Sequence, residues 1–119
     1  GPTMEFLRLL LVFLHLLGMA LLIGTFMLQA KAGPQAPVNK GWLHGTGLQL
    51  LTGLILMGLD PLNDEVSYNP IKIGIKLLVL VVIGALAIAF LRKPAAPRWL
   101  NPTLGALVVV NVGLAVFWS

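Results

Sequence analysis

The sequence predicts an all-α polytopic membrane protein, built as an antiparallel bundle of four transmembrane helices. Its 119 residues are 58% hydrophobic and only 10% charged, which is far from the usage of soluble globular domains. The mean hydropathy is +0.95. Four apolar runs of about 17–25 residues, each long enough to cross a bilayer, take up nearly the whole chain. A single transmembrane domain is therefore expected over residues 4–119, and residues 1–3 are interpreted as the remnant of a cleaved affinity tag.

The first two helices are expected at about 6–28 and 42–59. The first ends at QAKAGPQAPVNK, whose glycine, prolines and lysines interrupt a helix and favour contact with water. The second ends at DPLNDEVSYNP, an acidic loop rich in turn-forming residues.

The third and fourth helices are expected at about 71–91 and 104–118. The third begins directly after Pro70, and RKPAAPRW separates it from the fourth. Because each loop is only about ten residues long, successive helices are expected to run antiparallel.

The charges of the loops predict the orientation in the cytoplasmic membrane. Basic residues lie in the first and third loops and are absent from the second: Lys31, Lys40, Arg92, Lys93 and Arg98. Short basic loops stay on the cytoplasmic side, so both termini are expected outside. Aromatic residues near the helix ends are expected at the membrane interfaces, with Trp42 and Trp99 at the inner one and Tyr68 and Trp118 at the outer one.

Several function classes are excluded by composition. The chain has no cysteine, so disulfides, thiolate metal sites and thiol redox chemistry are ruled out. The basic residues sit at membrane edges instead of on a soluble face, so nucleic-acid binding is not expected. No nucleophile–base pair or paired carboxylates occur at membrane depth, which favours a non-enzymatic protein without catalytic residues.

The two halves of the chain resemble each other. RLLLVFLHLLGMAL compares with KLLVLVVIGALAI, PQAP with PAAP, and WLHGTG with WLNPTL. This pattern favours a duplicated helical hairpin, with a symmetry axis along the membrane normal. The alternative is that two apolar hairpins with proline-rich basic loops look alike through composition alone.

One face of the first helix carries most of its polar and small residues. Steps of three and four place the following on one stripe: Arg8, Leu11, His15, Gly18, Leu22, Thr25 and Gln29. Such a stripe is expected to face protein and not lipid.

His15 is the main candidate on that stripe, because it lies near the expected bilayer midplane. An ionisable group there indicates a functional site, either a ligand to a metal or cofactor or a proton carrier. The alternative is a neutral imidazole that hydrogen-bonds a neighbouring helix. His44 lies close to Trp42 and is expected among lipid headgroups, away from His15.

Lys76 has two candidate partners. Its long side chain can reach inward to His15 or outward to Asp60. Lys72 can also reach Asp60. Asn111 and Gln49 are expected to hydrogen-bond between helices. The candidate residues for binding a ligand or cofactor are His15, Lys76, Arg8, Gln49 and Asn111, with His15 as the candidate metal ligand.

Four segments carry a resemblance: FLHLLGMALLIGTF, HGTGLQLLTGLILMGL, IKLLVLVV and VVNVGLAVFW. In this order the chain resembles short, uncharacterised four-helix membrane proteins of actinobacterial type. More distantly, a histidine in the first helix followed by a lysine early in the third is similar to membrane protoporphyrinogen oxidases and copper-resistance D-like proteins. That similarity implies that His15 is a haem or metal ligand and that Lys76 lies near it, although the other histidines and the tryptophan-rich motifs of those families are missing.

Three functions fit these features. The first is a non-enzymatic membrane module that binds a ligand in a polar seam or acts as an accessory subunit. The second is a haem b or porphyrin protein with His15 as axial ligand. The third is a small dimeric transporter. The expected partners are the lipid bilayer and a second copy or a larger membrane complex, and no cofactor is required by the first function.

Overall fold

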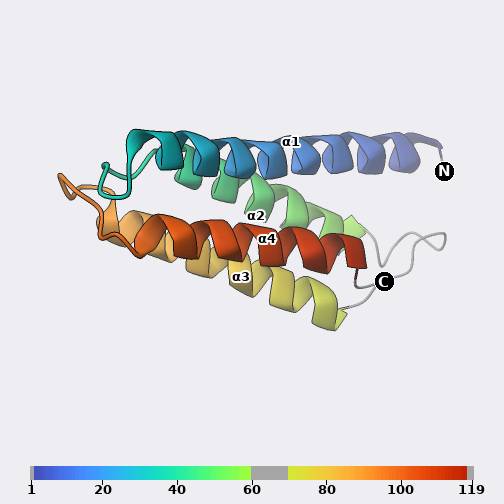
Figure 1. Cartoon of the computed structure of the whole chain (residues 1–119). Coiled ribbons are helices and arrows are strands. Elements are labelled where there is room, and N and C mark those ends of the chain that lie inside the picture. Colours follow the sequence, from blue (N-terminus) through green and yellow to red (C-terminus); the bar gives the residue numbers. More distant parts are fainter. Residues whose placement is uncertain (1, 60–69, 118–119) are drawn as a thin grey trace.

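The computed structural model of the chain describes residues 2–59 and 70–117, which form a four-helix bundle. The helices are α1 (Pro2–Ala32), α2 (Gly41–Leu59), α3 (Pro70–Phe90) and α4 (Leu100–Phe117). Loops 33–40 and 91–99 lie together at one end of an elongated molecule of 50 × 24 × 20 Å, and the start of α1 and the end of α4 lie at the other (Figure 1). The prediction of an all-helical chain with four helices is confirmed, and no strand occurs in the described residues.

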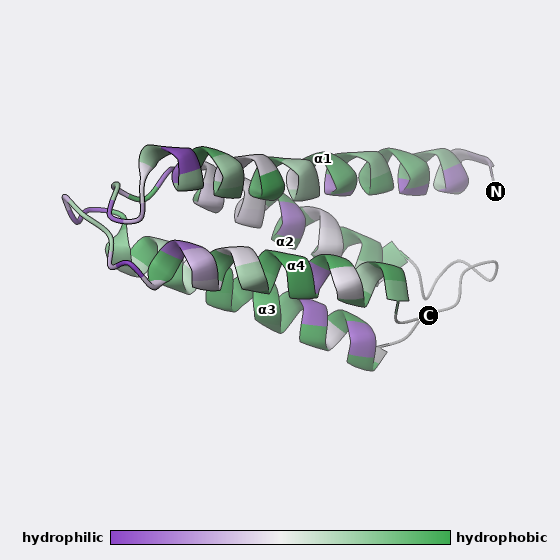
Figure 2. Cartoon of the chain, viewed as in Figure 1, coloured by the Kyte–Doolittle hydropathy of each residue, from purple (hydrophilic) through white to green (hydrophobic). Residues whose placement is uncertain are grey.

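All four helices are long and apolar enough to cross a membrane. Hydrophobic residues cover most of each ribbon, whereas hydrophilic ones concentrate in the loops and in short patches within the helices (Figure 2). Many large apolar side chains point outward, for example Phe13 and Val109, which are 57% and 69% exposed. A bundle that exposes this much apolar surface suits a lipid environment.

Two helices extend further than the sequence predicts. α1 begins at Pro2 instead of about residue 6, because proline at the first helical position needs no hydrogen-bonded N–H. It continues to Ala32 and stops at Gly33, whose φ of 114° lies in the left-handed region. α4 begins at Leu100 instead of Leu104, because Pro102 lies within the first turn, where its missing N–H breaks no helical bond.

The helices pack in a ring: each contacts the next one along the chain, and α1 also contacts α4. The backbones of α1 and α3 do not approach each other closely within the described residues, so these two helices face each other across the diagonal. The most extensive interface is that between α1 and α2. It follows that α2 is the main support for the inner face of α1.

The predicted inner stripe of α1 is confirmed. Its buried residues are Leu11, Gly18, Leu22, Thr25 and Gln29, and Arg8 and His15 on the same stripe are half-buried. The buried face of α2 is polar, although the helix as a whole is apolar. Its buried residues are Trp42, Gly45, Thr46, Gln49 and Thr52. Polar groups of α2 are therefore presented to the interior of the bundle.

Trp42 belongs to the core of the bundle at its loop end. It is fully buried and packs in the core with Leu100 and Leu104. Its indole fills the space where the two loops meet the bundle. Trp99 is 51% exposed and packs edge-to-face on Phe90 with ring centroids 5.6 Å apart. Tyr68 and Trp118 lie outside the described residues.

Candidate functional site

The candidate site is a hydrogen-bonded pair of basic side chains inside the bundle. Lys76 Nζ of α3 lies 2.5 Å from His15 Nε2 of α1. Because these helices sit diagonally across the bundle, the long lysine side chain spans the interior to reach the ring. The structure thus brings together His15 and Lys76, two of the residues singled out from the sequence. Of the two partners considered for Lys76, the inner one, His15, is in contact with its ammonium group.

Thr52 of α2 holds the other nitrogen of the imidazole ring. His15 Nδ1 lies 2.6 Å from Thr52 Oγ1, and that hydroxyl donates its hydrogen to the carbonyl oxygen of Leu48 at 2.7 Å. Gln49 O lies 3.3 Å from the same hydroxyl as a second backbone acceptor. A hydroxyl has one hydrogen, so a Thr52 that donates it to the backbone accepts from His15 Nδ1–H. The hydrogen-bond network therefore favours the tautomer with the proton on Nδ1.

This tautomer determines the direction of the bond to Lys76. Nε2 carries a lone pair, and the amine is a stronger base than the imidazole, so the Lys76 ammonium donates to Nε2. A continuous chain of donors then runs from Lys76 through His15 and Thr52 to the Leu48 carbonyl. Every polar atom of the His15 ring has a partner.

Gln49 fixes the backbone beneath the ring. Its amide nitrogen donates to the His15 carbonyl oxygen, which joins α2 to α1 one turn away from Thr52. A Cβ atom at Gly18 would lie 3.2 Å from that same amide nitrogen, so glycine permits the close approach of the two helices. Thr52 and Gln49 together hold His15 from two directions.

Acidic residues are scarce in the described part of the chain. The chain has four acidic side chains, and Glu5 is the sole one in residues 2–59 and 70–117. Glu5 lies ten residues before His15 on α1. Asp60, the alternative partner expected for Lys76, lies outside the described residues.

The remaining candidates are not brought into this pair. Arg8 is half-buried two turns along α1 from His15. Asn111 is buried in α4, but its Oδ1 has no partner in the described part of the chain, nor has Gln49 Oε1. The expected hydrogen bond from Asn111 to a neighbouring helix therefore stays a prediction, whereas Gln49 does bond α1 through the His15 carbonyl. His44 is exposed, as expected for a residue away from the seam.

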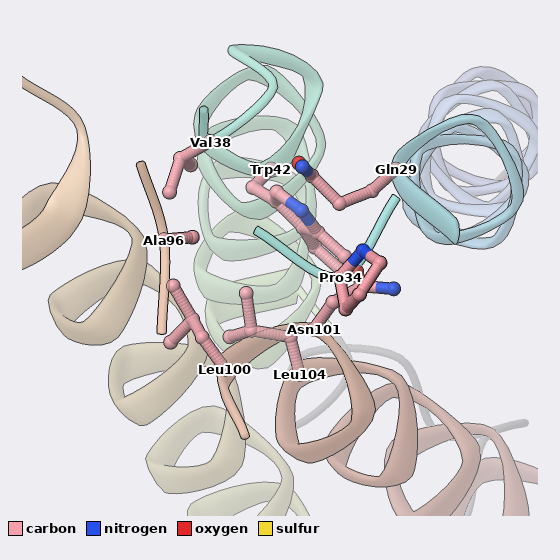
Figure 3. A pocket seen from close by; sticks show the side chains of 8 residues that line it. All are labelled: Gln29, Pro34, Val38, Trp42, Ala96, Leu100, Asn101 and Leu104. Atoms are coloured by element: carbon pink, nitrogen blue, oxygen red, sulfur yellow. The ribbon is translucent and has the colours of Figure 1, made fainter. Parts of the chain in front are cut away.

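A second group of polar atoms lies at the loop end of the bundle. A narrow hollow there is lined by these residues: Gln29, Pro34, Val38, Trp42, Ala96, Leu100, Asn101 and Leu104 (Figure 3). Trp42 Nε1 and Asn101 Oδ1 are buried there without a partner among the described residues. The hollow has no room for the centre of a water molecule, so it is closely packed and offers no ligand cavity.

Gln29 organises the loop around this hollow. Its amide nitrogen donates to the carbonyls of Ala36 and Pro37 at 3.2 and 2.9 Å, and its Oε1 accepts from Asn39 N at 2.8 Å. Gln29 is thus a structural clamp between α1 and the loop, a role that the sequence analysis did not assign. Its only sequence signal was its place at the end of the polar stripe.

A haem or metal does not fit the pair as it is arranged. Both ring nitrogens of His15 are already hydrogen-bonded, and Nε2 faces an ammonium group, which repels a metal cation. No group of three or more metal-ligating side chains occurs in the described residues. The implied role of His15 as an axial ligand would require Lys76 to leave first.

Comparisons with known proteins find no match, either to a family model, to a curated protein sequence or to a solved structure. Function is therefore argued from the site alone.

Proposed function

We propose that the chain is a non-enzymatic binding module of the cytoplasmic membrane, which takes the polar head group of a small ligand at His15 and Lys76. The observation that carries this proposal is the hydrogen bond between the two basic groups across the diagonal of the bundle. Two basic side chains hydrogen-bonded to each other are a costly way to join helices inside an apolar bundle. A neutral amide or hydroxyl would join them at lower cost.

The half-buried state of both side chains supports the same proposal. His15 and Lys76 are neither sealed in the core nor fully exposed, so a head group can reach them. The aliphatic stem of Lys76 is flexible and can move its ammonium without disturbing the helix. Thr52 and Gln49, in contrast, hold His15 in a fixed orientation, which suits a preorganised site.

The membrane arrangement belongs to this proposal. Four antiparallel transmembrane helices would place the basic loops 33–40 and 91–99 on the cytoplasmic side and both termini outside. The four apolar helices and the shared position of these two loops at one end support that arrangement (Figure 1). The likeness of the two helical hairpins in sequence favours their origin by duplication.

Binding is tested with hexanoate, hexanamide and hexanol, which share one chain and differ in the head group. The protein in lipid nanodiscs carries ¹⁵N in its histidine and lysine side chains, and the signals of His15 and Lys76 are followed during titration. We expect saturable shifts of both signals with at least one probe. The shift of the His15 signal should disappear in Lys76→Met, and the shifts of both signals should persist in the matched control His44→Gln, since His44 is exposed elsewhere. Absence of saturable shifts with all three probes would contradict the proposal.

A further inference from the structure

We infer that the ligand of the His15–Lys76 pair is a carboxylic acid, and that its carboxylate is bound together with one proton from solution. This inference rests on the proposed binding function and names its ligand class. It follows from the kinds of hydrogen-bonding groups that the pair presents, not from its charge alone.

The pair presents one donor and one acceptor side by side. Lys76 contributes N–H groups, and His15 Nε2 contributes a lone pair. Thr52 favours this arrangement, because a hydroxyl that donates to Leu48 O accepts from Nδ1–H. With the ring proton held on Nδ1, Nε2 remains an acceptor unless a second proton is added.

A protonated carboxyl group is the complement of such a pair. Its carbonyl oxygen can accept from Lys76 while its O–H donates to His15 Nε2. An ionised carboxylate has only acceptors, so one oxygen would face the Nε2 lone pair and leave both groups unsatisfied. The mismatch is removed when one proton is taken up, whether it resides on the carboxyl oxygen or on Nε2.

The charge balance agrees with this stoichiometry. The free pair carries one positive charge, that of the Lys76 ammonium. Adding a carboxylate and a proton brings in one negative and one positive charge, so the total inside the bundle does not change. No additional charge has to be desolvated in the apolar interior, and no bond other than that of the proton is made or broken.

Few other ionisable groups lie near the pair. On α2 the sole titratable side chain is His44, which is exposed, and α4 has none. On α3, Lys72 lies one turn from Lys76. On α1, Arg8 and Glu5 lie seven and ten residues before His15, and Lys31 lies at the far end of the helix. An ammonium or guanidinium group has no lone pair to offer a carboxyl O–H, so Glu5 is the one described side chain on these helices that could compete as a carboxylate.

The proton uptake is measured by calorimetry with hexanoate at one pH in two buffers that have different ionisation enthalpies. The His15→Leu/Lys76→Met double variant in the same nanodiscs supplies the heat of partitioning into lipid, which is subtracted. We expect uptake of about one proton per hexanoate bound. Binding without proton uptake would overturn this inference and leave the proposed function standing, whereas loss of all specific heat would contradict both.

Two matched probes and two variants sharpen the test. Hexanamide also offers one acceptor and one donor, so it should bind with no proton uptake, and methyl hexanoate, which lacks the donor, should bind at least tenfold more weakly. Thr52→Val removes the hydroxyl that holds the ring proton on Nδ1, so that proton can move to Nε2 and donate to the carboxylate. Proton uptake with hexanoate should then fall toward zero, and Thr52→Ser should restore it. Equal proton uptake in wild type and Thr52→Val would contradict the role of Thr52.

Discussion

Lys76 of α3 donates a hydrogen bond of 2.5 Å to His15 of α1, although the two helices face each other across the diagonal of the bundle. The contact is made by side chains and joins two helices whose backbones do not approach each other closely within the described residues. It therefore links α1 and α3 and also forms the chemically distinctive feature of the interior.

The energetic link between the two residues is tested by a double-mutant cycle. His15→Leu leaves the Lys76 ammonium without its acceptor, so it should lower the free energy of unfolding in detergent by about 1–2 kcal/mol. Adding Lys76→Leu removes the unpaired charge and should recover most of that loss. The expected coupling is about 0.5–2 kcal/mol. Additive effects of the two substitutions would show that the groups do not interact.

The role of Thr52 is tested through the tautomer of His15. The ¹⁵N spectrum of the histidine side chain in bilayers should show a protonated Nδ1 and an unprotonated Nε2 in wild type. Thr52→Val removes the acceptor and should shift the population toward the Nε2–H tautomer, while Thr52→Ser keeps the wild-type pattern. The matched control is His44→Gln, which removes the signal of the other histidine. An unchanged spectrum in Thr52→Val would contradict the assignment of the proton to Nδ1.

Close packing of α1 on α2 is tested at Gly45. A Cβ atom there would lie 2.7 Å from Leu22 Cδ2, and Leu22 is fully buried and cannot move aside. Gly45→Ala should therefore lower the free energy of unfolding by about 1–3 kcal/mol. Gly47→Ala is the control on the same helix, because nothing lies within 4 Å of its new Cβ, and it should be neutral or stabilise by up to about 1 kcal/mol. Equal effects of the two variants would refute the packing argument.

The proposed orientation is tested by labelling introduced cysteines, since the chain has none of its own. Cysteine at Asn63 should react with an impermeant thiol reagent in intact cells, because the second loop lacks basic residues. Cysteine at Gln35, in the basic first loop, should react only after the cells are opened. The reverse pattern would invert the topology.

The helices and their inner faces were predictable from the sequence because hydrophobicity and helical periodicity act locally. The stripe through Leu11, Gly18 and Leu22 needs only the spacing of residues along one helix, and the structure confirms it. The ends of α1 and α4 were less predictable, since a proline marks both a helix break and a favourable first turn. The burial of Trp42 in the core was not predictable either, because an aromatic residue beside a basic loop suits either a membrane interface or a core.

The candidate site could be predicted only in part. His15 and Lys76 stood out because ionisable residues are rare within apolar helices. The contribution of Thr52 could not be foreseen, because it depends on the rotation of α2 against α1 and on the single hydrogen of its hydroxyl. The partner of Asn111 could not be predicted for the same reason: pairing between helices depends on their relative rotation and depth, which periodicity within one helix does not specify.

The central claim is that Lys76 donates to an unprotonated Nε2 of His15 within the bundle. It is tested most directly by solid-state NMR of the protein in lipid bilayers, with ¹⁵N in the lysine and histidine side chains and His44→Gln as background. A through-space correlation between Lys76 Nζ and His15 Nε2, lost in Lys76→Met, is the predicted result. A His15 ring whose Nε2 is protonated and shows no correlation with Lys76 would contradict the account.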